Sequence, residues 1–372
     1  MSLQRHREQL DRIDNQLLDL IGERQKTIAA IGEIKRGMGK PLRDFAREKE
    51  VLDLASAHAR SRGLDGALAH DLMKLLIQHS LTTQENDQLR AEARGEGRRA
   101  LVVGGAGRMG RWFARFLDSQ GFVVELLDPA LPPGERSAEG FGQRRRLDQG
   151  ALDQELILIA AGIEASNQVM LELARLRPPG VVLDLASIKA PLAPGYQALQ
   201  AAGVAVASLH PLFGPSAVLL ADRHVVVIDL GAPRASALAR ELFAATTAVV
   251  VEMTLAEHDA LMAEVLGLSH VLNIVFAAAL AAGGADERRL ERISSTTFDA
   301  QTRVSRAVVN ENPDLYFEIQ QKNPNSPEVL DRLSRALADL RSALDQGDRA
   351  RFAAMMQAGQ KQLGPVASKP QG

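Results

Sequence analysis

The sequence predicts an α/β protein in three parts: an all-helical segment, a mainly parallel β-sheet with helices between its strands, and a second helical segment. Residues 3–90 carry apolar residues at helical spacing and show no strand-like alternation. From residue 99 short β-branched runs alternate with helical stretches, which is typical of βαβ units, and after Thr254 the pattern is helical again. We therefore expect an all-α domain over 1–90, a linker over 91–98, the sheet domain over 99–254, a helical domain over 255–363 and a disordered tail over 364–372.

The composition is that of a globular protein outside the membrane. Of 372 residues, 46% are hydrophobic and 24% are charged. The net charge of −2 shows no excess of positive charge of the kind that binds nucleic acid or an anionic membrane. The absence of cysteine excludes disulfides, thiol nucleophiles and cysteine metal ligands, and we expect no metal site. The first residues lack the apolar core of a signal peptide, and the longest apolar run, 271–282, is too short to span a bilayer. A cytoplasmic enzyme is the default expectation.

Three helices are expected in the first part. An apolar stripe with a 3–4 spacing predicts one long amphipathic helix, which the glycines and proline of "RGMGKPLRD" end. A second helix is expected from about Asp44 to Ser61 and a third from about Ala67 to Asn86. In the sheet domain the expected strands are "RALVVGG", "FVVELLD", "LILIAAG", "GVVLDLAS", "GVAVASLH", "RHVVVIDLG" and "TAVVVEM".

A glycine-rich turn follows the first of these strands. Gly105, Gly107 and Gly110 form GxGxxG between a strand and a helix, with Arg108 and Met109 inside the motif. In a doubly wound Rossmann sheet these glycines allow the tight turn, close approach of a pyrophosphate and packing of helix on strand. Asp128 ends the next strand, 18 residues beyond Gly110, where a carboxylate binds the ribose hydroxyls and favours NAD over NADP. The alternative is a similar turn that binds another ligand.

Two cations interrupt the apolar stripe of the first helix. The stripe passes through positions 10, 13, 17, 21, 24, 28, 31 and 35, so Arg24 and Lys35 share the face that should be buried. Such cations either extend to solvent, pair with acidic residues of the other helices, or meet an anionic ligand. Further polar residues at i, i+3 and i+4 spacings favour the ligand: Asp44, Arg47, Glu48, Ser80 and Gln84.

Arg7 belongs to the same helix but not to the same position along it. It lies 17 residues before Arg24, about 25 Å along a straight helix. Within one chain it cannot easily reach the ligand that Arg24 reaches. It could serve the site of a partner in a homodimer.

These residues, in "REQLDRIDNQLLDLIGERQKTIAAIGEIK", "RDFARE" and "SLTTQ", resemble the all-helical chorismate mutase family, whose three helices form an intertwined dimer. The resemblance implies that Arg24, Arg47, Ser80 and the partner's Arg7 bind the carboxylates of chorismate. It implies that Lys35 and Gln84 donate to the ether oxygen and that Glu48 holds the hydroxyl, with Asp44 also at the site. The pericyclic step to prephenate needs only orientation and electrostatic stabilisation of that oxygen.

The sheet domain, in "VVGGAGRMGRWFARFL", "DLASIK", "SLHPLFGP" and "AEHDALMAEVLGLSH", resembles the bifunctional chorismate mutase–prephenate dehydrogenase family. The resemblance implies NAD as cofactor, prephenate as second substrate, and C-terminal helices that complete the second site and a dimer interface. His210 ends a strand, where open α/β sheets bind ligands, and is the candidate base for the hydroxyl proton of prephenate. Ser187 is a candidate hydrogen-bonding neighbour of that hydroxyl, and the simplest interpretation of Lys189 beside it is a solvated charge.

Other residues of the second site are less defined. We interpret His258 as structural, and His270 is either a substrate contact or a satisfied core residue. The carboxylate-binding arginine of the family does not align without a gap, so either Arg303 or Arg306 takes that role. The strand end "AAGIEAS" also lacks the Val-Pro-Ile usual in the family.

Two alternatives remain open from the sequence. The dehydrogenase half could have decayed, leaving only the mutase. Alternatively, the all-helical segment 1–90 could be a dimerisation module attached to a dehydrogenase of another small acid.

Overall fold

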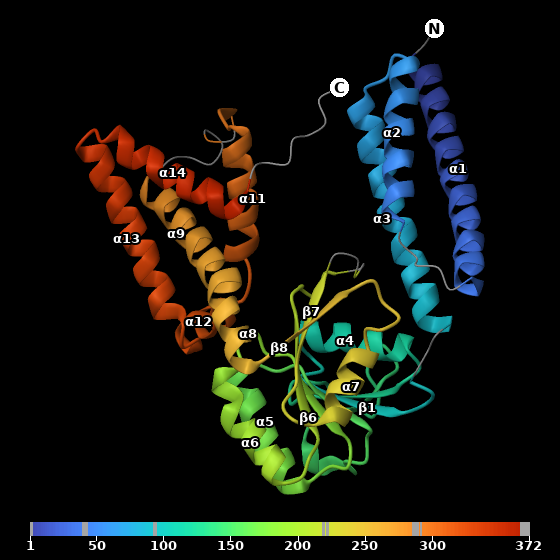
Figure 1. Ribbon diagram of the computed structural model, residues 1–372. Helices are drawn as coiled ribbons and strands as arrows, with labels where there is room; N and C mark the ends of the chain where they lie inside the picture. Colours follow the sequence, from blue (N-terminus) through green and yellow to red (C-terminus); the bar gives the residue numbers. More distant parts are fainter. Residues whose placement is uncertain are drawn as a thin grey trace. The chain divides into compact units, whose positions relative to one another are not determined.

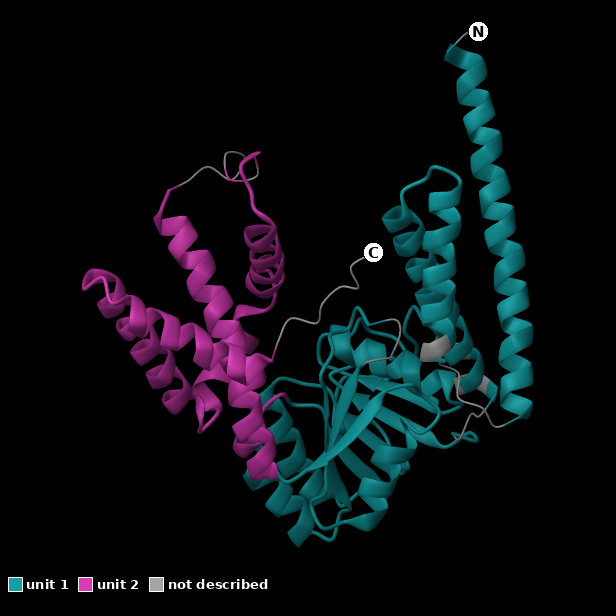
Figure 2. Ribbon diagram, turned by 45° about the horizontal axis from the view of Figure 1, so that its top comes forward, with its two compact units in different colours: residues 1–186, 192–254 teal, residues 187–191, 255–372 magenta. Residues whose placement is uncertain are grey.

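The computed structural model describes residues 3–38, 44–91, 95–217, 220, 223–284, 290 and 292–364. By their internal contacts the residues form two compact units, one of 1–186 and 192–254 and the other of 187–191 and 255–372 (Figure 2). The short segment 187–191 thus belongs with the helical unit, although it lies between strands in the sequence. The predicted tail, apart from Gly364, lies outside the described residues.

Three long helices form the head of the first unit: α1 (Leu3–Gly37), α2 (Phe45–Ser61) and α3 (Gly66–Ala91) (Figure 1). The carboxylate of Asp44 caps α2 by accepting from the Arg47 N–H at 3.0 Å, which fixes the start of this helix. Helix α3 continues five residues beyond the predicted end at Asn86. The predicted break between the first two helices lies partly outside the described residues.

The apolar stripe of α1 is only half covered within one chain. Leu10, Ile13 and Leu17 are 57%, 51% and 46% exposed, contrary to the expectation of a buried face. Within the chain α1 packs mainly on α3, and α1 has 35 residues whereas α3 has 26, so α3 cannot cover the whole length of α1. Farther along, Arg24, Ile28 and Lys35 are partly buried.

Eight strands form one sheet in the order β3-β2-β1-β4-β5-β6-β7-β8. All seven predicted strands are present, and the six from β3 to β6 in this order are parallel. Strand β7 runs antiparallel to β6 and parallel to β8. The strands are β1 (Arg99–Val103), β2 (Val123–Leu127), β3 (Gly142–Arg144), β4 (Leu156–Ile159), β5 (Val181–Asp184), β6 (Val206–Pro211), β7 (His224–Ile228) and β8 (Val249–Met253).

Helices cover the sheet as a doubly wound fold requires. Helices α4 (Arg108–Ser119) and α7 (Pro233–Glu241) contribute to one core cluster, in which Phe113, Phe116 and Phe243 pack edge-to-face or stacked. Helices α5 (Ile163–Leu176) and α6 (Ala193–Ala201) pack on each other.

Apart from the segment 187–191 and the turns between helices, the described part of the second unit is α- or π-helical. Its elements are α8 (Leu255–Met262), a π-helical turn (Ala263–Leu268), α9 (Ser269–Ala282), α11 (Thr296–Val309), α12 (Pro313–Lys322), α13 (Ser326–Asp345) and α14 (Arg349–Leu363). A polar cluster holds α9 and α11 together, because Asn273 Oδ1 accepts from Ser305 Oγ at 2.8 Å and from Gln301 Nε2 at 3.0 Å.

The helical run Leu255–Ala282 is longer than the apolar pattern predicted. Its 28 residues are long and apolar enough to cross a membrane by length and composition alone. The expectation that no apolar segment reaches that length was therefore wrong, because the helix continues through the π-helical turn and includes the residues before 271. Residues Leu261, Val265, Leu272 and Val275 along this run are exposed in the single chain.

Candidate active sites

The head contains a cavity of about 420 Å³ between its three helices. Seven of the eight polar residues selected from the sequence line it, and Arg7 is the exception. The predicted residues in the lining are Arg24, Lys35, Asp44, Arg47, Glu48, Ser80 and Gln84, and the apolar ones are Ile28, Ile31, Val51, Met73, Ile77 and Leu81. Two basic residues of α1 thus lie on a wall that also carries carboxylates and neutral donors.

Arg24 is held by neutral oxygens in this cavity. Its guanidinium donates to Ser80 Oγ at 2.6 Å and to the Leu76 carbonyl at 3.2 Å. Burial lowers the pKa of Arg24 from its ordinary value, and no carboxylate is among its hydrogen-bond partners in the described part of the chain. Because its positive charge is not neutralised there, Arg24 can bind an anion.

Gln84 is fixed on the opposite wall. Its side-chain amide donates to the Ile28 carbonyl at 3.0 Å, and the residue is 5% exposed. A methyl group on Gly32 would come within 3.4 Å of the Gln84 side chain, so this glycine makes room for α3 against α1. On α2, the Arg47 guanidinium contacts Glu50 at 2.6 Å, and Asp44 is committed to capping the helix.

The glycine turn has the tight geometry that a dinucleotide requires. A Cβ on Gly110 would lie 2.2 Å from the Gly104 carbonyl oxygen, and one on Gly105 would lie 2.8 Å from Leu126 Cβ. Gly104 has a φ of +83°, in the left-handed region. Gly107 caps α4, so the free N–H groups of that helix end face the turn.

A cavity of about 570 Å³ opens at this turn. Gly107 and Asp128 line it, while Gly105, Arg108, Met109 and Gly110 do not. Asp128 accepts from the Ala106 N–H at 3.1 Å and from the Ala130 N–H at 2.9 Å, which leaves acceptor capacity for a ribose. The space at the glycines, which a Cβ would fill, fits the pyrophosphate of a dinucleotide. The Asp128 carboxylate beside it fits the ribose.

Sequence reasoning missed part of this lining. Arg145 and Arg146 lie on the cavity wall just after β3, a strand that was not predicted. The Arg145 guanidinium donates to the Pro129 carbonyl at 3.0 and 2.7 Å, and Arg146 pairs with Asp148. The run "GQRRRLD" was the available signal, but charge runs usually indicate a solvated surface.

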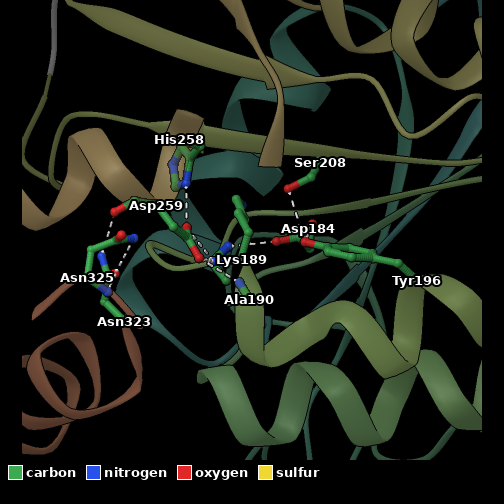
Figure 3. Close-up of polar contacts among 10 residues, drawn as sticks. Asp184, Lys189, Ala190, Tyr196, Ser208, His258, Asp259, Asn323 and Asn325 are labelled. Atoms are coloured by element: carbon green, nitrogen blue, oxygen red, sulfur yellow. Dashed lines mark hydrogen bonds and ion pairs between the residues drawn. The ribbon is translucent and has the colours of Figure 1, made fainter. Parts of the chain in front are cut away.

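His210 lies at the carboxyl end of β6, where it is 4% exposed and pairs with Val226 of β7. Two residues earlier, Ser208 Oγ lies 3.3 Å from the Tyr196 hydroxyl, which donates to the carboxylate of Asp184 at 2.8 Å (Figure 3). This buried network connects β5, β6 and α6. It fixes the end of the strand that carries His210.

A second buried polar cluster centres on Asp259 (Figure 3). Its carboxylate accepts from the Lys189 N–H at 2.9 Å and the Ala190 N–H at 2.7 Å, and lies 2.8 Å from His258 Nδ1. Burial opposes its ionisation, but the hydrogen bonds from His258 and the two N–H groups outweigh burial and lower the pKa of Asp259. The Asp259 carbonyl accepts from Asn323 at 2.8 Å.

These contacts bear on the sequence interpretations. Lys189 is 0% exposed, so the interpretation as a solvated charge was wrong; the segment 187–191 is packed into the helical unit instead. His258 is also 0% exposed and bonded to its neighbour. Asp259 was not selected from the sequence, although it stands in the quoted "AEHDALM".

His270 is half-buried and packs against Tyr316, with ring centroids 4.2 Å apart. Its Nδ1 is buried without a hydrogen-bond partner among the described atoms, and burial lowers the pKa of His270. Ser187 is half-buried in the segment 187–191.

Arg303 and Arg306 line one cavity of about 820 Å³ between α9 and α11. Asp299, Phe276 and Phe298 share that lining. Both arginines are exposed on the same helix, so the geometry does not distinguish between them as the carboxylate-binding residue.

Comparison with known proteins covers both halves of the chain. Residues 6–85 match the chorismate mutase type II family, and residues 254–358 match the prephenate dehydrogenase dimerisation domain. The T-protein of Enterobacter agglomerans is 28% identical over 348 residues, which are 94% of this chain and 89% of that protein. The chain belongs to the bifunctional chorismate mutase–prephenate dehydrogenase family.

Two further relatives each match about 70% of this chain. The 4-amino-4-deoxyprephenate dehydrogenase of Streptomyces pristinaespiralis is 31% identical over 266 residues, 69% of this chain and 88% of that protein. The crystal structure of prephenate dehydrogenase from A. aeolicus with hydroxyphenyl propionate and NAD+ has a TM-score of 0.55 and 16% identity, and covers 72% of this chain and 97% of that one. The latter shows the shared dehydrogenase fold.

Proposed function

We propose that this protein is a bifunctional enzyme of tyrosine biosynthesis. It rearranges chorismate to prephenate in the head, and it oxidises prephenate to 4-hydroxyphenylpyruvate and CO2 with NAD. The observation that carries the proposal is the head cavity, which seven of the polar residues predicted from the sequence line. The same chain also matches the prephenate dehydrogenase dimerisation domain.

In the mutase reaction the protein supplies orientation and charge. Arg24 and Arg47 bind the two carboxylates of chorismate, and Ser80, which already contacts Arg24, assists. Lys35 and Gln84 stabilise the negative charge that grows on the ether oxygen, and Glu48 accepts from the substrate hydroxyl. Because no proton is transferred, these groups act only by being held in place before the reaction.

In the dehydrogenase reaction, NAD held at the glycine turn would supply the acceptor for the hydride of the carbinol carbon. His210 takes the proton of the carbinol hydroxyl, to which Ser187 hydrogen-bonds. The ring carboxylate leaves as CO2, and the electrons of the broken bond complete the aromatic ring. Arg303 or Arg306 binds a substrate carboxylate, and His270 contributes a polar contact. Asp128 and the glycine turn, with Gly105, Gly107, Arg108, Met109 and Gly110, hold the dinucleotide.

The active form is a cytoplasmic homodimer in this proposal. Two surfaces support it: the exposed stripe of Leu10, Ile13 and Leu17 on α1, and the exposed apolar residues along 255–282. The second surface falls within the match to a dimerisation domain. Arg7 lies beyond the exposed stripe, where it can complete the cavity of the partner.

The test supplies the full-length protein with chorismate and NAD, and then with prephenate and NAD, while NADH is followed by absorbance. Both substrates should yield NADH. NADH from prephenate alone would refute the mutase, and loss of chorismate without NADH would refute the dehydrogenase. His210→Asn should abolish NADH formation and leave chorismate consumption intact. If both activities were lost, His210 would be a structural residue.

A further inference from the structure

A buried carboxylate joins the head to the sheet domain inside the first unit. Glu85 of α3 is 2% exposed, and its Oε2 accepts from the Leu220 N–H at 2.9 Å. Its Oε1 accepts from the Thr247 N–H at 2.8 Å and the Thr247 hydroxyl at 2.5 Å. The three donors lie 135 and 162 residues farther along the chain.

All three donors to Glu85 are neutral. A buried carboxylate is costly unless hydrogen bonds replace its hydration, and here both oxygens have partners from the sheet domain. The contact therefore depends on the position of the sheet-domain backbone. It is a fixed joint, not a flexible surface ion pair.

The two sides of this joint lead to different sites. On α3, Glu85 directly follows Gln84 and lies little more than one turn from Ser80, and both of those residues line the head cavity. On the sheet side, Leu220 lies in the connection between β6, which carries His210, and β7. Trp112 Nε1 anchors the same connection by donating to the Ala217 carbonyl at 2.8 Å.

We propose that Glu85 is a positioning residue that holds the Gln84 wall of the mutase cavity on the frame of the dehydrogenase domain. This inference rests on the proposed function, since it assigns the cavity to chorismate. Adjacent residues on a helix point about 100° apart, so Gln84 faces the cavity while Glu85 faces the sheet domain. Loss of the joint frees the end of α3 and displaces Gln84, although Glu85 does not touch the ligand.

The test compares Glu85→Gln with the wild type in the full-length protein. The amide places an NH2 group against a backbone N–H, so at least one bond to Leu220 or Thr247 is lost. We expect kcat/KM for chorismate to fall about tenfold, the effect of losing one hydrogen bond to a charged group. A stable bicyclic dicarboxylate that mimics the rearrangement should bind about tenfold more weakly in calorimetry.

Glu241→Gln is the control. Glu241 forms an ion pair with Arg98 at 2.9 Å, and its side chain is 34% exposed, so this variant removes a paired carboxylate by the same substitution without touching α3. It should leave chorismate turnover and dicarboxylate binding at the wild-type level.

Thr247→Val keeps the test decisive if Glu85→Gln unfolds. It removes one donor to Glu85 from a residue outside the head, and it should weaken the mutase in the same direction. In the double variant with Glu85→Gln, the mutase defect should be smaller than the product of the two single effects. A folded Thr247→Val or Glu85→Gln protein with wild-type mutase kinetics and dicarboxylate affinity would overturn the proposal. A wild-type protein without mutase turnover would instead refute the proposed function.

Discussion

At the scale of single residues, the head cavity depends on a cation whose hydrogen bonds go to neutral oxygens. Arg24 contacts Ser80 and a carbonyl, so its charge remains available to a substrate carboxylate. Arg24→Ala should lower kcat/KM for chorismate by about a hundredfold or more, because one preorganised charge is lost. Oxidation of supplied prephenate should be unchanged.

Arg12→Ala is the control for this prediction, since Arg12 is exposed on the same helix and does not line the cavity. Chorismate consumption, measured in samples quenched at fixed times, gives the mutase rates of the Arg24→Ala and Arg12→Ala variants. If Arg24→Ala kept full mutase activity and only the assembly state changed, the head would be a dimerisation module.

The buried ring of His270 predicts a pH dependence of stability. Burial lowers the pKa of His270 below its ordinary value of 6.5, so the unfolded chain takes up the proton at a higher pH than the native chain does. The stabilisation is complete above about pH 6.5 and is lost as the pH falls from there through the folded-state pKa. Urea unfolding of the wild type and of His270→Gln between about pH 5 and pH 8 measures this contribution of His270 to the free energy of unfolding. Parallel stability curves for the two proteins would contradict the assignment.

At the scale of elements, the sequence predicted those that carry a strong pattern. Seven strands were recognised because each is an apolar run with β-branched residues, whereas β3 has three residues and no apolar pattern. The reversed direction of β7 and β8 could not be predicted, because direction depends on the path of the connections. The stripe of α1 was found, but its exposure in a single chain was not.

The same reasoning applies to the site residues. The head residues were predicted together because their spacing on long helices fixes their faces. Arg145 and Asp259 were missed, because one follows an irregular segment and the other acts through backbone N–H groups of a distant segment. No local pattern reports such a contact.

The turn between β1 and α4 gives a prediction for an element. Gly110→Ala would place a methyl group 2.2 Å from a backbone oxygen, which cannot move without opening the turn. Binding of NAD, followed by fluorescence quenching of Trp112, should weaken by at least about tenfold, whereas mutase activity should persist. Gly359→Ala is the control, because nothing lies within 4 Å of the added carbon. Equal NAD affinity in both variants would show that the turn does not hold the cofactor.

At the scale of the whole molecule, the exposed stripe of α1 predicts a mutase site shared between subunits. Arg7→Ala and Arg24→Ala should each inactivate the mutase when purified alone. Co-expressed, half of the dimers contain one chain of each kind, and one of their two sites has both arginines. About a quarter of the wild-type mutase activity should then return. Recovery no greater than the sum of the separate variants would mean that each site is built from one chain.

The segment 187–191 has a consequence for how the molecule can be divided. The chain passes between the two units after residues 186, 191 and 254, so no single cut yields both units whole. A fragment beginning at Leu255 would keep the Asp259 carboxylate but lack the N–H groups of Lys189 and Ala190 that neutralise its burial. In a gene fusion or exchange between relatives, these five residues have to travel with the C-terminal helices and not with the sheet that surrounds them in the sequence.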